Sequence, residues 1–123
     1  MHKTTTIRIL KTVDTVEEAI DILKKSKLTG KSLEKAINAF LESYPENYRK
    51  LTNRTKISKI ERISIVIGAL QDMLESHLSI TWDNVRKALE VANSWSPVCW
   101  AIATQLSEKT ETPIPSDIEK LCQ

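Results

Sequence analysis

The sequence predicts an all-α fold, a compact antiparallel bundle of five to six helices around one long central helix. Apolar residues recur at helical spacing through residues 57–78. Capping patterns, in which a hydroxyl precedes a carboxylate by three positions, stand before several apolar runs. Pro45, the Ser79–Thr81 link and Ser96-Pro97 interrupt the chain too often for four long helices. With 123 residues, 41% of them hydrophobic, the chain is long enough for one domain with one core, residues 1–123.

The central helix is expected over residues 57–78 and organises the rest of the bundle. Ser58-Lys59-Ile60-Glu61 is a capping box at its start. Its circumference is almost entirely apolar, so we expect neighbours to bury it on several sides. The apolar positions are Ile60, Ile63, Ile65, Val66, Ile67, Ala69, Leu70, Met73, Leu74 and Leu78.

The first 13 residues are expected to form an arm. Residues 4–10 are rich in threonine and isoleucine, which favour β-strands. A single strand is not stable alone, so this β-prone segment is either a frayed arm or a strand that pairs with another chain.

The helical core is expected over residues 14–108. Thr15-Val16-Glu17-Glu18 opens a helix over about residues 15–28, which Gly30 closes as a cap or turn glycine. Ser32 is predicted to cap a helix over about 32–44. Pro45 should end it, because the residue before proline is pushed out of the α region.

Residues 46–53 are expected to form a short helix or a single turn that buries Tyr48 and Leu51. Beyond the central helix, Thr81 is predicted to cap a helix that buries Trp82, Val85, Ala88, Leu89 and Ala92. Ser96-Pro97 starts the next helix, since proline suits a first helical turn. That helix is expected to bury Val98, Ala101, Ile102, Gln105 and Leu106. Residues 109–123 form a tail, in which Ser116-Asp117-Ile118-Glu119 is a third capping box opening a last short helix.

Charge is distributed unequally along the chain, although the net charge is only +2. Residues 1–62 hold 14 basic and 8 acidic residues, whereas residues 63–123 hold 4 and 8. A basic run is the strongest surface signal, because its six cations meet only Glu61: Arg49, Lys50, Arg54, Lys56, Lys59 and Arg62. It could contact nucleic-acid phosphates or a carboxylate-rich protein surface.

No motif for catalysis, a metal or a cofactor is present, so we expect neither an enzyme nor a bound cofactor. His2 and His77 are the only histidines, and Gly30 and Gly68 are too far apart for a phosphate-binding loop. Cys99 and Cys122 lack the spacing of zinc ligands, and the simplest interpretation is a reducing compartment in which both thiols stay reduced. Neither a signal peptide nor a membrane span is expected, so we predict a cytoplasmic protein. The missing catalytic motifs predict that it has no small-molecule substrate. Trp82, Trp95 and Trp100 are either core residues or interface anchors.

Residues 28–108 carry a resemblance to a known family. Leu28-Thr29-Gly30-Lys31-Ser32-Leu33 and residues 39–45 resemble the opening of bacterial effector-associated domains, which are similar to the death fold. Residues 72–75 and 81–89 resemble the passage from the fourth to the fifth helix of animal death-like domains. The resemblance implies a non-enzymatic adaptor that self-assembles or recruits a similar domain in defence or cell-death signalling.

A second resemblance covers residues 4–44, where a strand and two helices resemble a ribbon-helix-helix DNA-binding arm. That resemblance implies that Thr4, Thr6 and Arg8 enter the major groove of DNA.

Our main hypothesis is therefore an adaptor module that forms homotypic or heterotypic assemblies through charge-complementary faces. The runner-up is a small DNA-binding regulator, and a subunit or inhibitor that docks on a larger complex is a third possibility. The expected basic face comprises Arg49, Lys50, Arg54, Lys56 and Lys59. The expected acidic face comprises Asp72, Glu75, Asp83 and Glu90.

Overall fold

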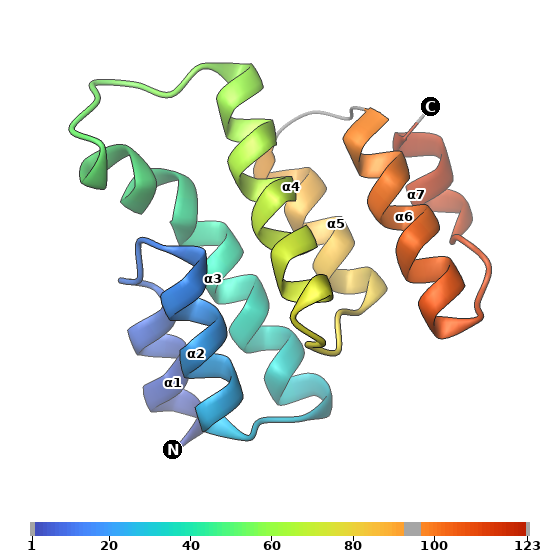
Figure 1. The fold of residues 1–123 in the computed structure, drawn as a ribbon, viewed down its shortest axis with the longest axis horizontal. Helices are drawn as coiled ribbons and strands as arrows, with labels where there is room; N and C mark the ends of the chain where they lie inside the picture. Colours follow the sequence, from blue (N-terminus) through green and yellow to red (C-terminus); the bar gives the residue numbers. More distant parts are fainter. Residues whose placement is uncertain (1, 93–96, 123) are drawn as a thin grey trace.

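The computed structural model is all-helical, as predicted. It describes residues 2–92 and 97–122, with only the backbone of Pro97 and Val98, and these residues contain seven helices and no strand. The helices are α1 (Lys3–Leu10), α2 (Val16–Ser26), α3 (Gly30–Leu51), α4 (Lys59–Glu75), α5 (Trp82–Ala92), α6 (Pro97–Thr110) and α7 (Ser116–Leu121). Figure 1 shows α1, α2 and α3 at one end of the molecule, α4 and α5 in the middle, and α6 and α7 at the other end.

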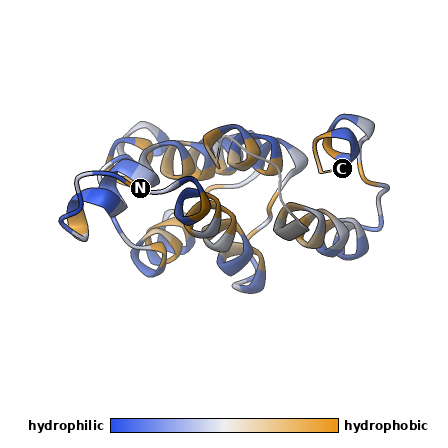
Figure 2. Ribbon diagram, turned by 90° about the horizontal axis from the view of Figure 1, so that it is seen from above, coloured by the Kyte–Doolittle hydropathy of each residue, from blue (hydrophilic) through white to orange (hydrophobic). Residues whose placement is uncertain are grey.

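The core lies between α3, α4 and α5. Hydrophobic and hydrophilic residues alternate around the turns of the helices (Figure 2), so each helix has an apolar side to bury. The largest side chains that are fully buried come from six of the helices: Leu10, Leu23, Ile37, Phe40, Leu41, Val66, Ile67, Leu70, Met73, Ile102, Leu106 and Ile118. Asn84 on α5 is also fully buried, and it donates to the Glu34 carbonyl of α3 and to Asn38 Oδ1.

Three of the predicted helix starts are confirmed by their capping hydrogen bonds. The Ser58 hydroxyl accepts from the Glu61 N–H at 3.1 Å, and the Thr15 hydroxyl accepts from the Glu18 N–H at 3.3 Å. Thr81 and Asn84 cap α5 reciprocally, since each side-chain oxygen accepts from the other residue's N–H. Local sequence therefore sets where α2, α4 and α5 begin.

The predicted β-prone arm is wrong, because residues 3–10 form α1. The His2 imidazole accepts from the Thr4 N–H at 3.2 Å and caps this helix. Thr6 and Leu10 share one side of α1, are fully buried, and belong to the side that packs on α3. Burial against a helical neighbour outweighs the β-propensity of these residues. The strand that the ribbon-helix-helix alternative assigned to Thr4, Thr6 and Arg8 is not formed.

The prediction that Pro45 ends a helix is also wrong, because α3 continues through it to Leu51. Position 45 donates no hydrogen bond to the Leu41 carbonyl, and the axis of α3 turns in its C-terminal part (Figure 1). Phe40, Tyr44 and Tyr48 stand four residues apart across the proline. The ring centroids of Phe40 and Tyr44 are 4.7 Å apart, and those of Tyr44 and Tyr48 are 6.0 Å apart. This aromatic row and the burial of Pro45 itself favour a continuous helix. The cap of α3 is Thr29 rather than the predicted Ser32, and the separate turn over 46–53 does not exist.

The central helix α4 is shorter than predicted, and it is not buried all round. Val66, Ile67, Ala69, Leu70, Met73 and Leu74 are buried, as is Leu78 beyond the helix, while Ile63 and Ile65 are half-buried. Ile60 is 80% exposed. The first turn of α4 extends past the neighbouring helices. Ile60 is therefore exposed, although its apolar side chain predicted burial.

The C-terminal helices follow the predicted order with different details. Pro97 begins α6 as predicted, while Ser96 lies outside the described residues. Ile102 and Leu106 are buried on α6, whereas Ala101 and Gln105 are exposed. Ser116 is the first residue of α7 and not its cap, which is Pro115.

Four helices are followed by a residue with a side chain in the left-handed region. These residues are Lys27 after α2, Asn53 after α3, His77 after α4 and Glu111 after α6, with φ between 56° and 69°. Gly30, with φ +59°, opens α3 and is the predicted turn glycine.

Within the described residues, none of the helices combines the length and the apolar character that crossing a membrane requires.

Candidate functional site

The predicted basic residues lie together around the loop between α3 and α4, which extends away from the helices in Figure 1. Two of the arginines close this loop. Arg49 pairs with Glu46, with Nη2 and Oε1 2.6 Å apart, and its Nη1 donates to the Arg54 carbonyl at 2.7 Å. Arg54 pairs in turn with Glu61. The hydrogen bond from Arg49 holds the pKa of the Glu46 carboxyl below its ordinary value.

The three lysines of this basic set remain available to a partner. Lys50, Lys56 and Lys59 are exposed and make no ion pair with any other described residue. Arg62 instead donates to the Val91 carbonyl at 3.3 Å and ties α4 to α5.

The structure places the predicted acidic residues in two separate regions. Asp83 and Glu90 stand on α5 beside cations: Asp83 lies 2.6 Å from Arg86, and Glu90 lies 3.8 Å from Lys87. Arg86 also pairs with Asp117 of α7, with Nε and Oδ2 2.7 Å apart. The Arg86–Asp117 pair links α5 to α7, and the three pairs together leave little uncompensated charge there.

Asp72 and Glu75 lie in the other region, at the C-terminal end of α4. Both are exposed, and neither pairs with a described cation. They share a hollow of the surface with Glu17 of α2. The predicted acidic face did not include Glu17 or Asp14, because nothing local to either residue indicates that α2 and α4 are adjacent.

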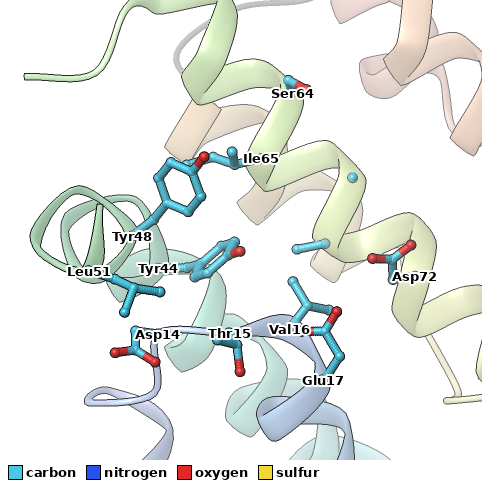
Figure 3. A pocket seen from close by; sticks show the side chains of 12 residues that line it. Asp14, Thr15, Val16, Glu17, Tyr44, Tyr48, Leu51, Ser64, Ile65 and Asp72 are labelled. Atoms are coloured by element: carbon cyan, nitrogen blue, oxygen red, sulfur yellow. The ribbon is translucent and has the colours of Figure 1, made fainter. Parts of the chain in front are cut away.

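An open groove of about 320 Å³ lies along α4 and includes Asp72 in its lining. Figure 3 shows its three sides: Tyr44, Tyr48 and Leu51 from α3, residues 14–17 at the start of α2, and the exposed side of α4. Its apolar lining includes Ile65 and the 53%-exposed Leu51. Carboxylates stand at its rim, where Glu17 and Asp72 project from opposite walls (Figure 3).

Two features of the groove report on its environment. Burial, assisted by Glu17, Tyr48, Asp72 and Asp14, raises the pKa of Tyr44 to about 12, so the phenol is neutral and the rim is electronegative. Gly68 stands on the α4 side, and no neighbouring atom lies within 4 Å of the place where its side chain would begin. The chain itself therefore leaves the space above Gly68 unfilled.

The tryptophans, histidines and cysteines do not line this groove. Trp82 is half-buried and donates to the Thr112 hydroxyl at 3.3 Å, Trp100 is 42% exposed on α6, and Trp95 lies outside the described residues. His77 is exposed in the turn after α4, and His2 caps α1. Cys122 is buried, and this burial raises the pKa of its thiol to about 11. Within the described part of the chain, no group of three His, Cys, Asp or Glu residues could hold a metal ion.

Comparison with known proteins does not assign this arrangement to a family. No protein-family model matches the sequence, and no curated protein or solved structure is significantly similar to it.

Proposed function

We propose that this chain is a non-enzymatic interaction module that binds a protein partner through two charged surfaces, the basic loop between α3 and α4 and the acidic groove along α4. The observation that carries this proposal is the set of charges without partners. Lys50, Lys56 and Lys59 are exposed around the loop between α3 and α4, whereas Glu17 and Asp72 line the groove and share an adjoining hollow with Glu75. Charges arranged in this way mainly determine partner choice and association rate.

Exposed apolar side chains supply part of the area that an interface needs. Leu51 in the groove and Ile60 on the first turn of α4 are large hydrophobic side chains that are mostly exposed. Exposed apolar surface surrounded by polar residues is typical of a protein contact site. The proposed role in defence or cell-death signalling depends on the resemblance to death-fold domains alone, and it stays a prediction.

Capture experiments with a tagged chain test this proposal. The wild type should retain at least one protein, which can be a second copy of the chain, at low salt and release it at high salt. A variant with Lys56→Glu and Lys59→Glu should lose the captured protein. A control with Lys3→Glu and Lys120→Glu reverses the same number of exposed lysines on α1 and α7 and should keep it.

Two results would contradict the proposal. One is capture that is identical for the wild type and the Lys56→Glu, Lys59→Glu variant. The other is salt-dependent binding of duplex DNA that the lysine reversals abolish, which would favour the DNA-binding alternative.

A further inference from the structure

The groove along α4 contains a hydroxyl group that no other described residue uses. Tyr44 is only 7% exposed, and Figure 3 shows its side chain extending from α3 toward α4 across the groove. The Tyr48 hydroxyl donates to Glu61 at 3.5 Å, whereas the Tyr44 hydroxyl makes no hydrogen bond within the described part of the chain. Every fully enclosed side-chain polar atom of the described residues has a partner, so the Tyr44 oxygen must open into the groove.

The rim of the groove is acidic, and no cation balances it. Asp14, Glu17 and Asp72 line the groove, and its described lining contains no lysine, arginine or histidine. Glu17 and Asp72 share the adjoining hollow with Glu75, and none of these three carboxylates forms an ion pair with a described residue. Asp14 differs, because it also borders a hollow with Lys50. Glu17 and Asp72 are therefore the uncompensated carboxylates of the groove.

The end of α4 adds to the attraction for a cation. Asp72 and Glu75 lie in its last turn, which contains no basic residue. The C-terminal end of a helix carries a partial negative charge, so carboxylates there are unfavourable and cations are favourable. Lys109 of α6 reaches this end, but it donates to the Leu74 carbonyl at 3.1 Å and forms no ion pair with either carboxylate. A cation from outside the chain would therefore be attracted by both the carboxylates and the helix dipole.

The space beside these carboxylates is apolar and unfilled. Ile65 and the 53%-exposed Leu51 belong to the lining of the groove. On the α4 wall, no neighbouring atom lies within 4 Å of the place where a side chain at Gly68 would begin. The groove therefore combines an apolar surface with acceptor oxygens from three helices. This combination matches a long side chain that has an apolar stem and a cationic end.

We propose that this groove binds an arginine side chain that a protein partner presents. The guanidinium holds several N–H donors in a planar fork and can serve acceptors on two walls, whereas the ammonium of lysine is a compact point charge. In the groove it pairs with Glu17 of α2 and Asp72 of α4, which project from opposite walls (Figure 3), and it donates to the Tyr44 oxygen. Its methylene stem covers Ile65. This inference rests on the proposed function and specifies what the acidic groove recognises.

A titration with short peptides tests the choice of arginine. The probe is an acetylated and amidated peptide with one arginine between alanines, added to the full-length chain and followed by NMR of the backbone amides. The signals of Glu17, Gly68 and Asp72 should shift. A peptide with citrulline in place of arginine keeps the shape and loses the charge, so it should bind at least about tenfold more weakly. A lysine peptide should bind at least about threefold more weakly.

Substitutions at the acceptors separate binding from folding. Tyr44→Phe keeps the ring and removes a hydroxyl that has no described hydrogen-bond partner, so it should weaken binding of the arginine peptide by about threefold or more without lowering the melting temperature. Glu17→Gln with Asp72→Asn should weaken it by about tenfold or more. The matched control, Glu108→Gln with Glu119→Gln, neutralises two exposed carboxylates on α6 and α7 and should bind as the wild type does.

Filling the space on the α4 wall tests where the arginine side chain lies. Gly68→Leu should prevent binding of the arginine peptide. The same variant should melt at or above the wild-type temperature, because leucine is the better helix former and meets no neighbour. Gln105→Leu adds an exposed leucine on α6 and should bind the peptide normally.

Several outcomes would overturn this inference. They are no shift with the arginine peptide at millimolar concentration, shifts confined to α6 and α7, equal binding of the citrulline or lysine peptide, and undiminished binding by Tyr44→Phe or Gly68→Leu. The proposed function can fail or survive separately. If the groove binds no arginine peptide while Lys56→Glu with Lys59→Glu still abolishes capture, this inference is wrong and the proposed function holds through the basic loop.

Discussion

The substitution Asn84→Ala should destabilise the fold more than any exposed substitution of similar size. Asn84 is fully buried on α5, and its side chain makes four hydrogen bonds. Its Oδ1 accepts from the Thr81 N–H at 3.0 Å and the Thr81 hydroxyl at 3.2 Å. Its Nδ2 donates to the Glu34 carbonyl at 3.2 Å and to Asn38 Oδ1 at 2.7 Å. Alanine removes all four bonds and leaves half-buried partners in both α3 and the α5 cap.

The magnitude follows from the number of bonds. A typical net contribution is about 1 kcal/mol per bond, so the loss in unfolding free energy should be about 2–4 kcal/mol after partial rescue by water. This is a large fraction of the total for a domain, which is about 5–15 kcal/mol. For a chain of this size the melting temperature should fall by roughly 10 °C.

Urea denaturation followed by circular dichroism measures this loss. Gln105→Ala removes an exposed amide from α6 and should change the unfolding free energy by less than about 0.5 kcal/mol. If Asn84→Ala lowered stability by no more than this control, the hydrogen bonds between α3 and α5 would not stabilise the fold.

Three further predictions concern other contacts. Asn47→Ala removes the bonds that Nδ2 donates to the Lys11 and Val13 carbonyls at 2.9 Å and 3.1 Å, and should cost about 1–2 kcal/mol; hydrogen exchange that is not faster in α1 would contradict this link. Hydrogen bonds from Arg86 lower the pKa values of Asp83 and Asp117, so this pairing stabilises the fold above about pH 4 and the stabilisation is lost as the pH falls through the lowered values. Arg86→Met should therefore be less stable than the wild type at neutral pH and approach it in acid, and a constant difference in pH-dependent melts would refute the pairing. The Cys122 thiol, with its pKa raised to about 11 by burial, should react with iodoacetamide much more slowly at neutral pH in the folded chain than in urea, and equal rates by mass spectrometry would show that it is accessible.

Short-range patterns predicted the parts of the fold that depend on neighbours in sequence. The caps at Thr15, Ser58 and Thr81 involve residues three positions apart, and each lies where the sequence indicated. The helical character of the chain and the burial of most of α4 follow from periodicity in the same way.

The errors involve contacts between residues far apart in sequence. Residues 3–10 are helical because they pack on α3. Helix α3 continues through Pro45 because Phe40 and Tyr44 are buried before it and Tyr48 is half-buried after it. Neither partner surface can be recognised from the segment itself. Local β-propensity and the usual effect of proline therefore gave the wrong boundaries.

The candidate site was only partly predictable for the same reason. Lys50, Lys56, Lys59, Asp72 and Glu75 were identified as charged surface residues, whereas the groove that Asp72 lines depends on how α2, α3 and α4 are arranged. Asp14, Glu17 and Tyr44 join the site only through that arrangement. One signal was present in the sequence, namely an isolated glycine in the middle of an otherwise apolar helix, at Gly68.

The way four helices end has a consequence for protein engineering. Lys27, Asn53, His77 and Glu111 are all exposed and all adopt a backbone conformation that costs an L-residue roughly 1–2 kcal/mol and costs glycine almost nothing. The chain contains only two glycines in 123 residues, and none of the four turns has a glycine at this position. Glycine substitutions at these four exposed positions should therefore raise the stability of the protein, and none of them requires a buried side chain to repack.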